Sequence, residues 1–227
     1  MTAAWRQFVT LVAKDLRIEA RTRQTVGLVT ILGVLILAVL GLGLGVGQRV
    51  SGPAASAILW VAYLFSGVLC FEKTMAVERQ DGALAGLLMA PVDRGLLYAG
   101  KLVTNLVLIL ALATVVTLVG MLFLRFDLSG IARPFIVITA LAMLGFAAVG
   151  TLFGAAVSST RLQGGLLALV VFPITLPLVI TSTQLMMRMD AGSHFWEQAG
   201  GGIGVLVAFD AVYLALSWLV FELLLEP

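Results

Sequence analysis

Charged residues are scarce in this chain of 227 residues. Asp, Glu, Lys and Arg make up 11% of it, whereas soluble domains average about 25%. Hydrophobic residues make up 61%. A soluble fold of this size has too few polar side chains to cover so much apolar surface. The composition therefore excludes a soluble globular domain and predicts a protein whose apolar surface faces a lipid bilayer.

The residues and motifs of common catalytic centres are also missing. Cys70 is the single cysteine and His194 the single histidine, which excludes an intrachain disulfide, a cysteine cluster and any site with several histidines. There is no phosphate loop of the form G-x-x-x-x-G-K-[ST] and no G-x-S-x-G motif. We expect no catalytic residues, no metal site and no ATP hydrolysis by this chain, although a carboxylate-based membrane hydrolase is left open.

Apolar runs of spanning length are what the sequence has in abundance. A spanning helix needs about 20 apolar residues, and these runs lack the alternation of a membrane barrel. The runs are Gln24–Gln48, Val50–Phe71, Leu102–Leu124, Pro134–Thr160, Leu162–Met187 and, interrupted by Asp210 and Glu222, about Gly200–Leu225. We predict one all-α membrane domain, residues 1–227, with six transmembrane helices.

Lysine and arginine are unevenly divided between the predicted loops. With the N-terminus on the cytoplasmic side, that side receives ten of them and the other side four. Because cytoplasmic loops collect Lys and Arg, both termini are predicted to be cytoplasmic. The basic residues are explained by this orientation, and no surface of interleaved basic and aromatic residues predicts binding of nucleic acid.

Residues 1–23 form a predicted amphipathic helix. One face carries the apolar side chains Trp5, Phe8, Val9, Val12 and Leu16, and the opposite side carries the basic side chains Arg6, Lys14, Arg17 and Arg21. Such a helix is suited to lie among lipid headgroups, so membrane lipid is an expected partner. A solvated helix packed on a partner protein is the alternative.

The connection between the second and third spans, residues 72–101, is too charged to span and too long for a tight turn. Charged Glu78, Arg79 and Asp81 precede an apolar edge made of Leu84, Leu87 and Leu88, which predicts a short cytoplasmic helix. Pro91 would end that helix and begin the next, which can continue into the third span. An ordinary solvated loop is the alternative interpretation.

Sequence motifs in this connection resemble those of a known family. Glu78-Arg79-Gln80-Asp81-Gly82-Ala83-Leu84, then Leu87-Leu88-Met89-Ala90-Pro91-Val92 and Gly100-Lys101, are similar to the signature of ABC-2-type transporter permeases. The whole chain resembles the CcmB family, the haem exporter B proteins of cytochrome c maturation. The resemblance includes the length, the six spans, Phe71-Glu72-Lys73 and the pair Phe172-Pro173 with Pro177.

This resemblance implies a permease subunit in a bacterial inner membrane that works with a separate ABC ATP-binding subunit. The residues around Glu78–Pro91 would seat in that ATPase. Other implied partners are a haem-handling membrane subunit, a small membrane subunit and a second copy of the chain. ATP hydrolysis would drive either the export of haem or the release of a haem-loaded chaperone. The alternatives are a permease for a lipid, a drug or a polysaccharide, and a scaffold that transports nothing.

Polar or helix-breaking residues inside the predicted spans are further candidates. Pro173 and Pro177, four apart in the fifth span, predict a hinge or a static kink. Asp210 lies inside the sixth span, where an ionisable group is costly and suggests a function. A structural hydrogen bond from Asp210 to a serine or threonine of a neighbouring helix is the alternative.

Residues that could ligate haem gather near the outer end of the fifth span. Met186 and Met187 lie at that end, and His194 lies in the following loop. We favour simpler interpretations: packing for the methionines, and a position at the membrane interface for the histidine. No cofactor is therefore assigned to this chain.

Overall fold

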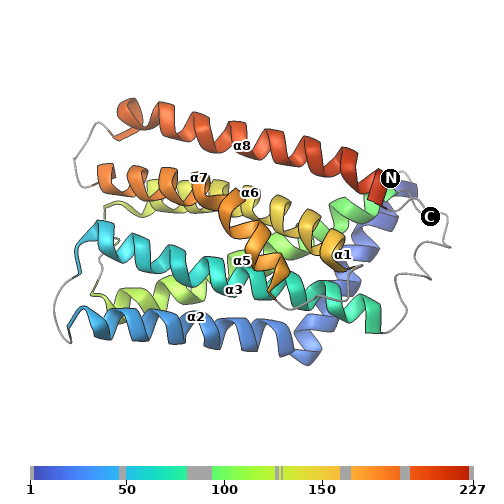
Figure 1. The fold of residues 1–227 in the computed structure, drawn as a ribbon, viewed down its shortest axis with the longest axis horizontal. Helices are drawn as coiled ribbons and strands as arrows, with labels where there is room; N and C mark the ends of the chain where they lie inside the picture. Colours follow the sequence, from blue (N-terminus) through green and yellow to red (C-terminus); the bar gives the residue numbers. More distant parts are fainter. Residues whose placement is uncertain are drawn as a thin grey trace.

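Seven helices make up the described part of the chain. The computed structural model describes residues 3–45, 50–80, 94–125, 128, 130–158, 165–189 and 195–224. In chain order the helices are α1 (Ala3–Thr22), α2 (Gln24–Gly43), α3 (Gly52–Gln80), α5 (Arg94–Phe123), α6 (Ala132–Ser158), α7 (Leu166–Met189) and α8 (Phe195–Leu224), as Figure 1 shows. These residues include no strand, so the predicted all-α fold is confirmed.

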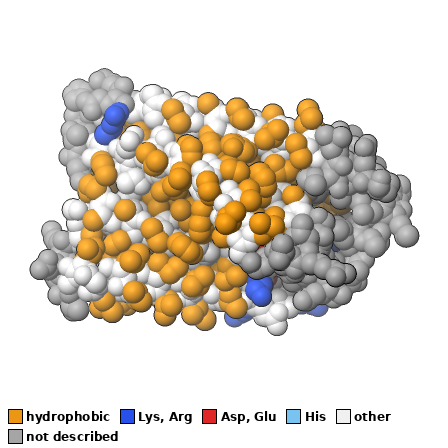
Figure 2. All heavy atoms as spheres, viewed as in Figure 1, with side chains coloured by type: hydrophobic (Ala, Val, Ile, Leu, Met, Phe, Trp, Pro, Cys, Tyr) orange, Lys and Arg blue, Asp and Glu red, His pale blue; other side chains and the backbone are white. Residues whose placement is uncertain are grey.

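Six of these helices are long and apolar enough to cross a bilayer. The spanning stretches are Gln24–Gly43, Gly52–Met75, Gly95–Phe123, Ala132–Val157, Leu166–Arg188 and Ala199–Val220. They coincide with the six predicted runs, and the prediction of a six-span membrane protein is confirmed. In Figure 2 hydrophobic side chains cover the visible face along most of the bundle, and the visible Lys and Arg side chains lie toward its two ends.

The six helices run up and down, which gives the bundle two distinct ends. We call the end at which α2, α5 and α7 begin and α3, α6 and α8 finish the N-terminal end, and the opposite one the distal end (Figure 1). Helix α1 lies at the N-terminal end. The connection that contains the predicted coupling residues joins α3 to α5 at this same end.

Helices α3 and α6 form the centre of the bundle. In an apolar window of 18 residues within each helix, 67% of the residues of α3 and 72% of those of α6 are buried, against 17% in α2 and in α8. The outer helix α2 exposes a stripe of large apolar side chains four residues apart, Ile31, Leu35 and Val39. Such a stripe fits contact with lipid tails, whereas the core at α3 and α6 is filled by aromatic and small residues.

Helix α1 is separated from the first span by a sharp corner at one residue. Arg23 adopts a left-handed conformation with φ of 51°, which a residue other than glycine adopts uncommonly, and α2 begins directly after it. The exposed Trp5 and Val9 lie on the side of α1 predicted to be apolar. The N-terminal amphipathic helix therefore exists as predicted, and its position among lipid headgroups stays a prediction.

Helix α3 extends further than the sequence indicated. The residues after Phe71 were predicted to belong to a connection, but α3 continues without a break to Gln80. Residues 72–80 contain no glycine or proline and favour a helix even though they are charged. The helix thus continues past the apolar run. On the other side, α5 runs from Arg94 through Lys101 into the third span, as predicted.

Candidate functional site

The predicted coupling residues lie where α3 and α5 are joined. Glu78 and Arg79 belong to the last turn of α3, where the structure describes the backbone alone. The other five coupling residues lie outside the described residues, and their contacts stay predictions; they are Asp81, Leu84, Leu87, Leu88 and Pro91. Because both flanking helices continue into the bundle, a force on this connection reaches two spans directly.

A chain of hydrogen-bonded polar side chains links three spans near this connection. The Thr74 hydroxyl on α3 donates to Asn105 Oδ1 on α5 at 2.9 Å, and Asn105 Nδ2 donates to Thr151 Oγ1 on α6 at 2.9 Å. Asn105 and Thr151 are fully buried. Hydrogen bonds between spans stabilise a membrane bundle by roughly 0.6 kcal/mol each on average. The polar chain Thr74–Asn105–Thr151 therefore ties α3, α5 and α6 together.

Close packing between α3 and α6 strengthens this connection. The ring of Phe71 lies so near Gly150 that any side-chain carbon there would overlap the ring. Phe71 also packs edge-to-face on Phe146 of α6, with ring centroids 5.1 Å apart. Phe146 in turn fills the space above Gly67 of α3. Rings set against glycines resist sliding, because a shift of either helix forces overlap.

Helix α1 is attached to α5 close to the same connection. Lys101 Nζ of α5 and Asp15 Oδ2 of α1 form an ion pair at 2.7 Å, and their side chains are only 13% and 12% exposed. Beside this pair, Leu11 and Val12 of α1 pack over Gly100. An ion pair with so little exposure is screened less by salt than a surface pair. The N-terminal helix is thereby fixed to the first turns of α5.

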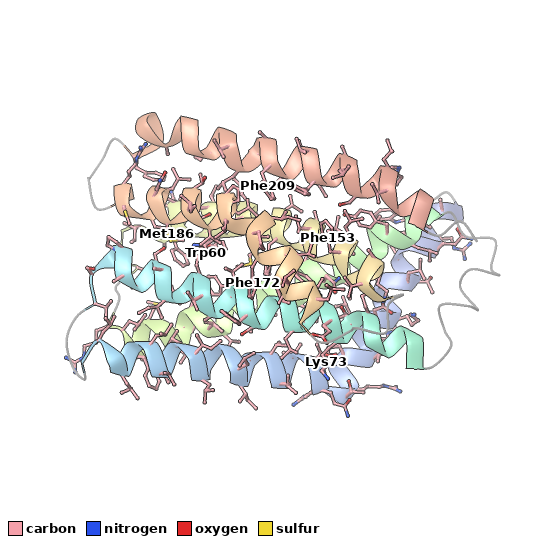
Figure 3. All side chains as sticks on the ribbon, viewed as in Figure 1. Trp60, Lys73, Phe153, Phe172, Met186 and Phe209 are labelled. Carbon is pink, nitrogen blue, oxygen red and sulfur yellow. The ribbon has the colours of Figure 1, made fainter. Side chains whose placement is uncertain are left out.

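Asp210 lies in the middle of α8 and is only 4% exposed. Its carboxyl lies against Gly145 of α6. One carboxyl oxygen occupies the space that a side chain at position 145 would need. Leu178 of α7 reaches the same place. Figure 3 labels the preceding residue, Phe209, between α8 and the helices beneath it. Within the described residues neither carboxyl oxygen bonds a serine or threonine, so that alternative gains no support.

The candidate haem ligands are not brought together by the described residues. Met186 is buried and accepts a hydrogen bond from Ser56 Oγ at 2.7 Å, whereas Met187 is 48% exposed. His194 lies outside the described residues. In the part of the chain that the structure describes, no three His, Cys, Asp or Glu residues are grouped so as to hold a metal ion. The structure supports packing as the role of Met186.

The two prolines lie inside α7, which remains one helix around them. Pro173 and Pro177 each lack an N–H, so each removes one backbone hydrogen bond from the helix. In Figure 1 α7 changes direction along its length. Leu178, which follows Pro177, is the residue of α7 that meets Asp210 at Gly145. The bent part of α7 and the buried carboxyl are therefore neighbours.

Comparison with known proteins assigns the chain to a family. The sequence model of the family described as CcmB protein matches residues 6–224, nearly the whole chain. The chain belongs to the CcmB family.

Curated relatives of this CcmB-family chain carry one name. It is 32% identical to the heme exporter protein B of Paracoccus denitrificans over 187 residues, which cover 81% of the chain and 84% of that relative. It is 27% identical to the heme exporter protein B of Rhodobacter capsulatus, with 80% and 83% covered. The protein of the same name from Bradyrhizobium diazoefficiens is 26% identical, with 91% of each covered.

Two features of the CcmB-family chain escaped prediction from its sequence. The polar chain Thr74–Asn105–Thr151 consists of uncharged residues, and single threonines are common in membrane helices without any special role. The ion pair of Asp15 with Lys101 joins residues 86 positions apart. A signal for Asp15 is its place near the apolar edge of a predominantly basic helix, where an acid needs a partner.

Proposed function

We propose that this chain is the membrane component of a haem export system that serves cytochrome c biogenesis. The observation that carries the proposal is the CcmB family match over residues 6–224, together with three relatives named heme exporter protein B. The six spans and the absence of a phosphate-loop motif fit a transporter membrane subunit. ATP hydrolysis then takes place in a separate ABC ATP-binding subunit.

The N-terminal end of the bundle faces the cytoplasm of a bacterial inner membrane in this proposal. The Lys and Arg residues in the N-terminal helix and in the connection between α3 and α5 support this orientation. ATP is cytoplasmic, so the ATPase docks at this end. Residues 78–91 form the docking element, with Leu84, Leu87 and Leu88 as its packed contact and the charges before them at its rim.

The contacts around α3 suggest how a movement of the ATPase would enter the membrane. A push on the connection moves the ends of α3 and α5 together. The polar chain Thr74–Asn105–Thr151 and the packing of Phe71 on Gly150 pass this movement to α6. The ion pair of Asp15 with Lys101 keeps α1 attached to α5 as it moves. Helices α3, α5 and α6 therefore respond as one unit.

Co-expression with the ATP-binding subunit of the same organism tests the docking element. Leu87→Asp together with Leu88→Asp is expected to abolish co-purification of the ATPase and its stimulation by the membrane subunit, with normal membrane insertion. The control variant, Thr160→Asp together with Gln163→Asp, adds the same charge to the connection between α6 and α7, which is predicted to lie on the same side. This control should keep both the co-purification of the ATPase and its stimulation. Wild-type binding by the double leucine variant would disprove docking through residues 78–91.

The same preparation separates transport from assembly. A scaffold that transports nothing would hold the ATPase without changing its rate of hydrolysis, whereas a transporter subunit is expected to change it. A permease for a lipid, a drug or a polysaccharide would stimulate the ATPase but would leave formation of haem-containing cytochrome c unaffected when it is deleted. The haem-handling and small membrane subunits, and a second copy of the chain, are expected in the purified complex.

A further inference from the structure

Asp210 is a carboxylic acid for which the surrounding helices provide no counter-charge. It lies in the middle of α8 and is 4% exposed. Among the described residues the one donor that faces its carboxyl is the backbone N–H of Gly145, which does not reach the geometry of a full hydrogen bond. Helices α5, α6 and α7 pack against α8. An ionised carboxylate at this depth in a membrane protein requires a cation or several donors. The question is therefore what neutralises Asp210.

The charged groups on the three neighbouring helices are too distant to pair with Asp210. On α6 the one charged residue is Arg133, 12 positions or about 18 Å along the helix from Gly145. On α7 it is Arg188, ten positions or about 15 Å from Leu178. On α5 the titratable groups are Arg94, Tyr98 and Lys101, all in its first turns.

Those first turns of α5 meet α8 well away from Asp210. Gly95 of α5 packs against Trp218, eight positions or about 12 Å along α8 from Asp210. On α8 itself the nearest titratable residue is Tyr213, whose ring packs on Phe209 at a centroid distance of 4.4 Å. A phenol is no counter-charge, so the helices around Asp210 provide no cation within contact distance.

A metal ion does not fit this place either. No group of three His, Cys, Asp or Glu residues that could hold a metal occurs in the described part of the chain. A single carboxyl without further ligands cannot satisfy the coordination of a metal cation. A proton is the one cation that a lone carboxyl binds by itself.

We propose that Asp210 is a proton-binding site, and that it holds its proton whenever α6, α7 and α8 are packed as in this structure. The absence of a side chain at Gly145 leaves room for the acid against α6. Parting α7 or α8 from α6 admits water, and the proton leaves Asp210 for that water.

Infrared spectroscopy of the purified full chain in dodecyl maltoside, a detergent without carbonyl groups, tests the proposal directly. A protonated carboxyl has a carbonyl stretching band separate from the amide bands and from ionised carboxylates. At neutral pH the wild type is expected to show this band, and Asp210→Asn is expected to lose it. Asp15→Asn is the matched control: it removes an acid that is paired with Lys101, and the band should remain.

A second measurement needs no variant to fold. Carbon-13 in the carboxyl groups of all aspartates should shift the band in the wild-type protein, because the band belongs to an aspartate. A wild type without the band at neutral pH, a band that the label does not shift, or a band that remains in Asp210→Asn would each overturn the proposal.

The pH dependence of thermal unfolding gives an independent result. An unfolded chain releases an aspartate proton near pH 4, whereas the packed protein retains it. The proton therefore stabilises the fold fully at low pH, and this stabilisation falls as pH rises above about 4. On unfolding, the wild type should release up to one proton per molecule more than Asp210→Asn. The melting temperature of the wild type should therefore fall more steeply as pH rises. Identical slopes for the two proteins would contradict the proposal. Proton binding at Asp210 does not depend on the identity of the cargo.

Discussion

Replacement of Asn105 by leucine is the sharpest test of how the three central spans are connected. Leucine is similar in size and suits an apolar interior, but it can neither accept from Thr74 nor donate to Thr151. Hydrogen bonds between membrane helices contribute about 0.6 kcal/mol on average and about 1.7 kcal/mol at most. Loss of two should therefore lower the free energy of unfolding by about 1–3 kcal/mol.

Denaturant unfolding in detergent or bicelles measures this loss, and Thr114→Val provides the matched control. Thr114 lies on the same helix, but it is exposed and its hydroxyl bonds its own backbone at Leu110, so its replacement should change the unfolding free energy by less than about 0.5 kcal/mol. A double-mutant cycle of Asn105→Leu with Thr74→Val isolates the pair. Additive effects, or an unchanged Asn105→Leu protein, would refute the polar chain.

The same Asn105→Leu protein tests whether the polar chain carries movement. With the ATPase bound normally, loss of the link to α6 should reduce the membrane subunit's effect on the rate of ATP hydrolysis. A destabilised protein with wild-type stimulation would show that the polar chain supports the fold and plays no part in coupling.

Two further predictions follow from single contacts, and a third follows from the distribution of Lys and Arg. Gly150→Ala should destabilise the protein by about 1–3 kcal/mol in denaturant unfolding, because the new carbon overlaps a ring of α3, whereas Gly204→Ala meets nothing within 4 Å and should not. Lys101→Met leaves the nearly buried carboxylate of Asp15 with the more exposed Lys14, 3.0 Å away, as its remaining ion-pair partner, and should cost up to about 3 kcal/mol by the same measurement. In a cysteine-free background, Gln80→Cys should be shielded from an impermeant thiol reagent in intact cells and Gly52→Cys labelled; the reverse would invert the proposed topology.

Run length and charge were enough to predict the spans, because a bilayer imposes a minimum length on every apolar helix. The end of α3 was not predictable in the same way. Bilayer thickness limits the apolar run but not the helix, and residues 72–80 continue α3 in spite of their charges. A sequence window defined by hydropathy therefore underestimates how far a helix projects from the membrane.

The candidate site was predictable only in part. Asp210 is visible in the sequence because a lone acid interrupts an apolar run. Its surroundings are not, since Gly145 and Leu178 reach it from two other helices. For the same reason the partners of Asn105, which are Thr74 and Thr151, could not be found without a three-dimensional structure. Each partner lies on a different helix, and neither spacing nor residue type distinguishes these two threonines from the others.

Formation of haem-containing cytochrome c in the organism that carries this chain is the decisive measurement for a haem export function. The gene is deleted, and either the wild type or the variant with Leu87→Asp and Leu88→Asp is returned at equal membrane levels. We expect that deletion removes haem-stained cytochrome c, that the wild type restores it, and that the variant does not. Normal cytochrome c in the deletion strain, or full restoration by the variant, would contradict a haem exporter driven through residues 78–91.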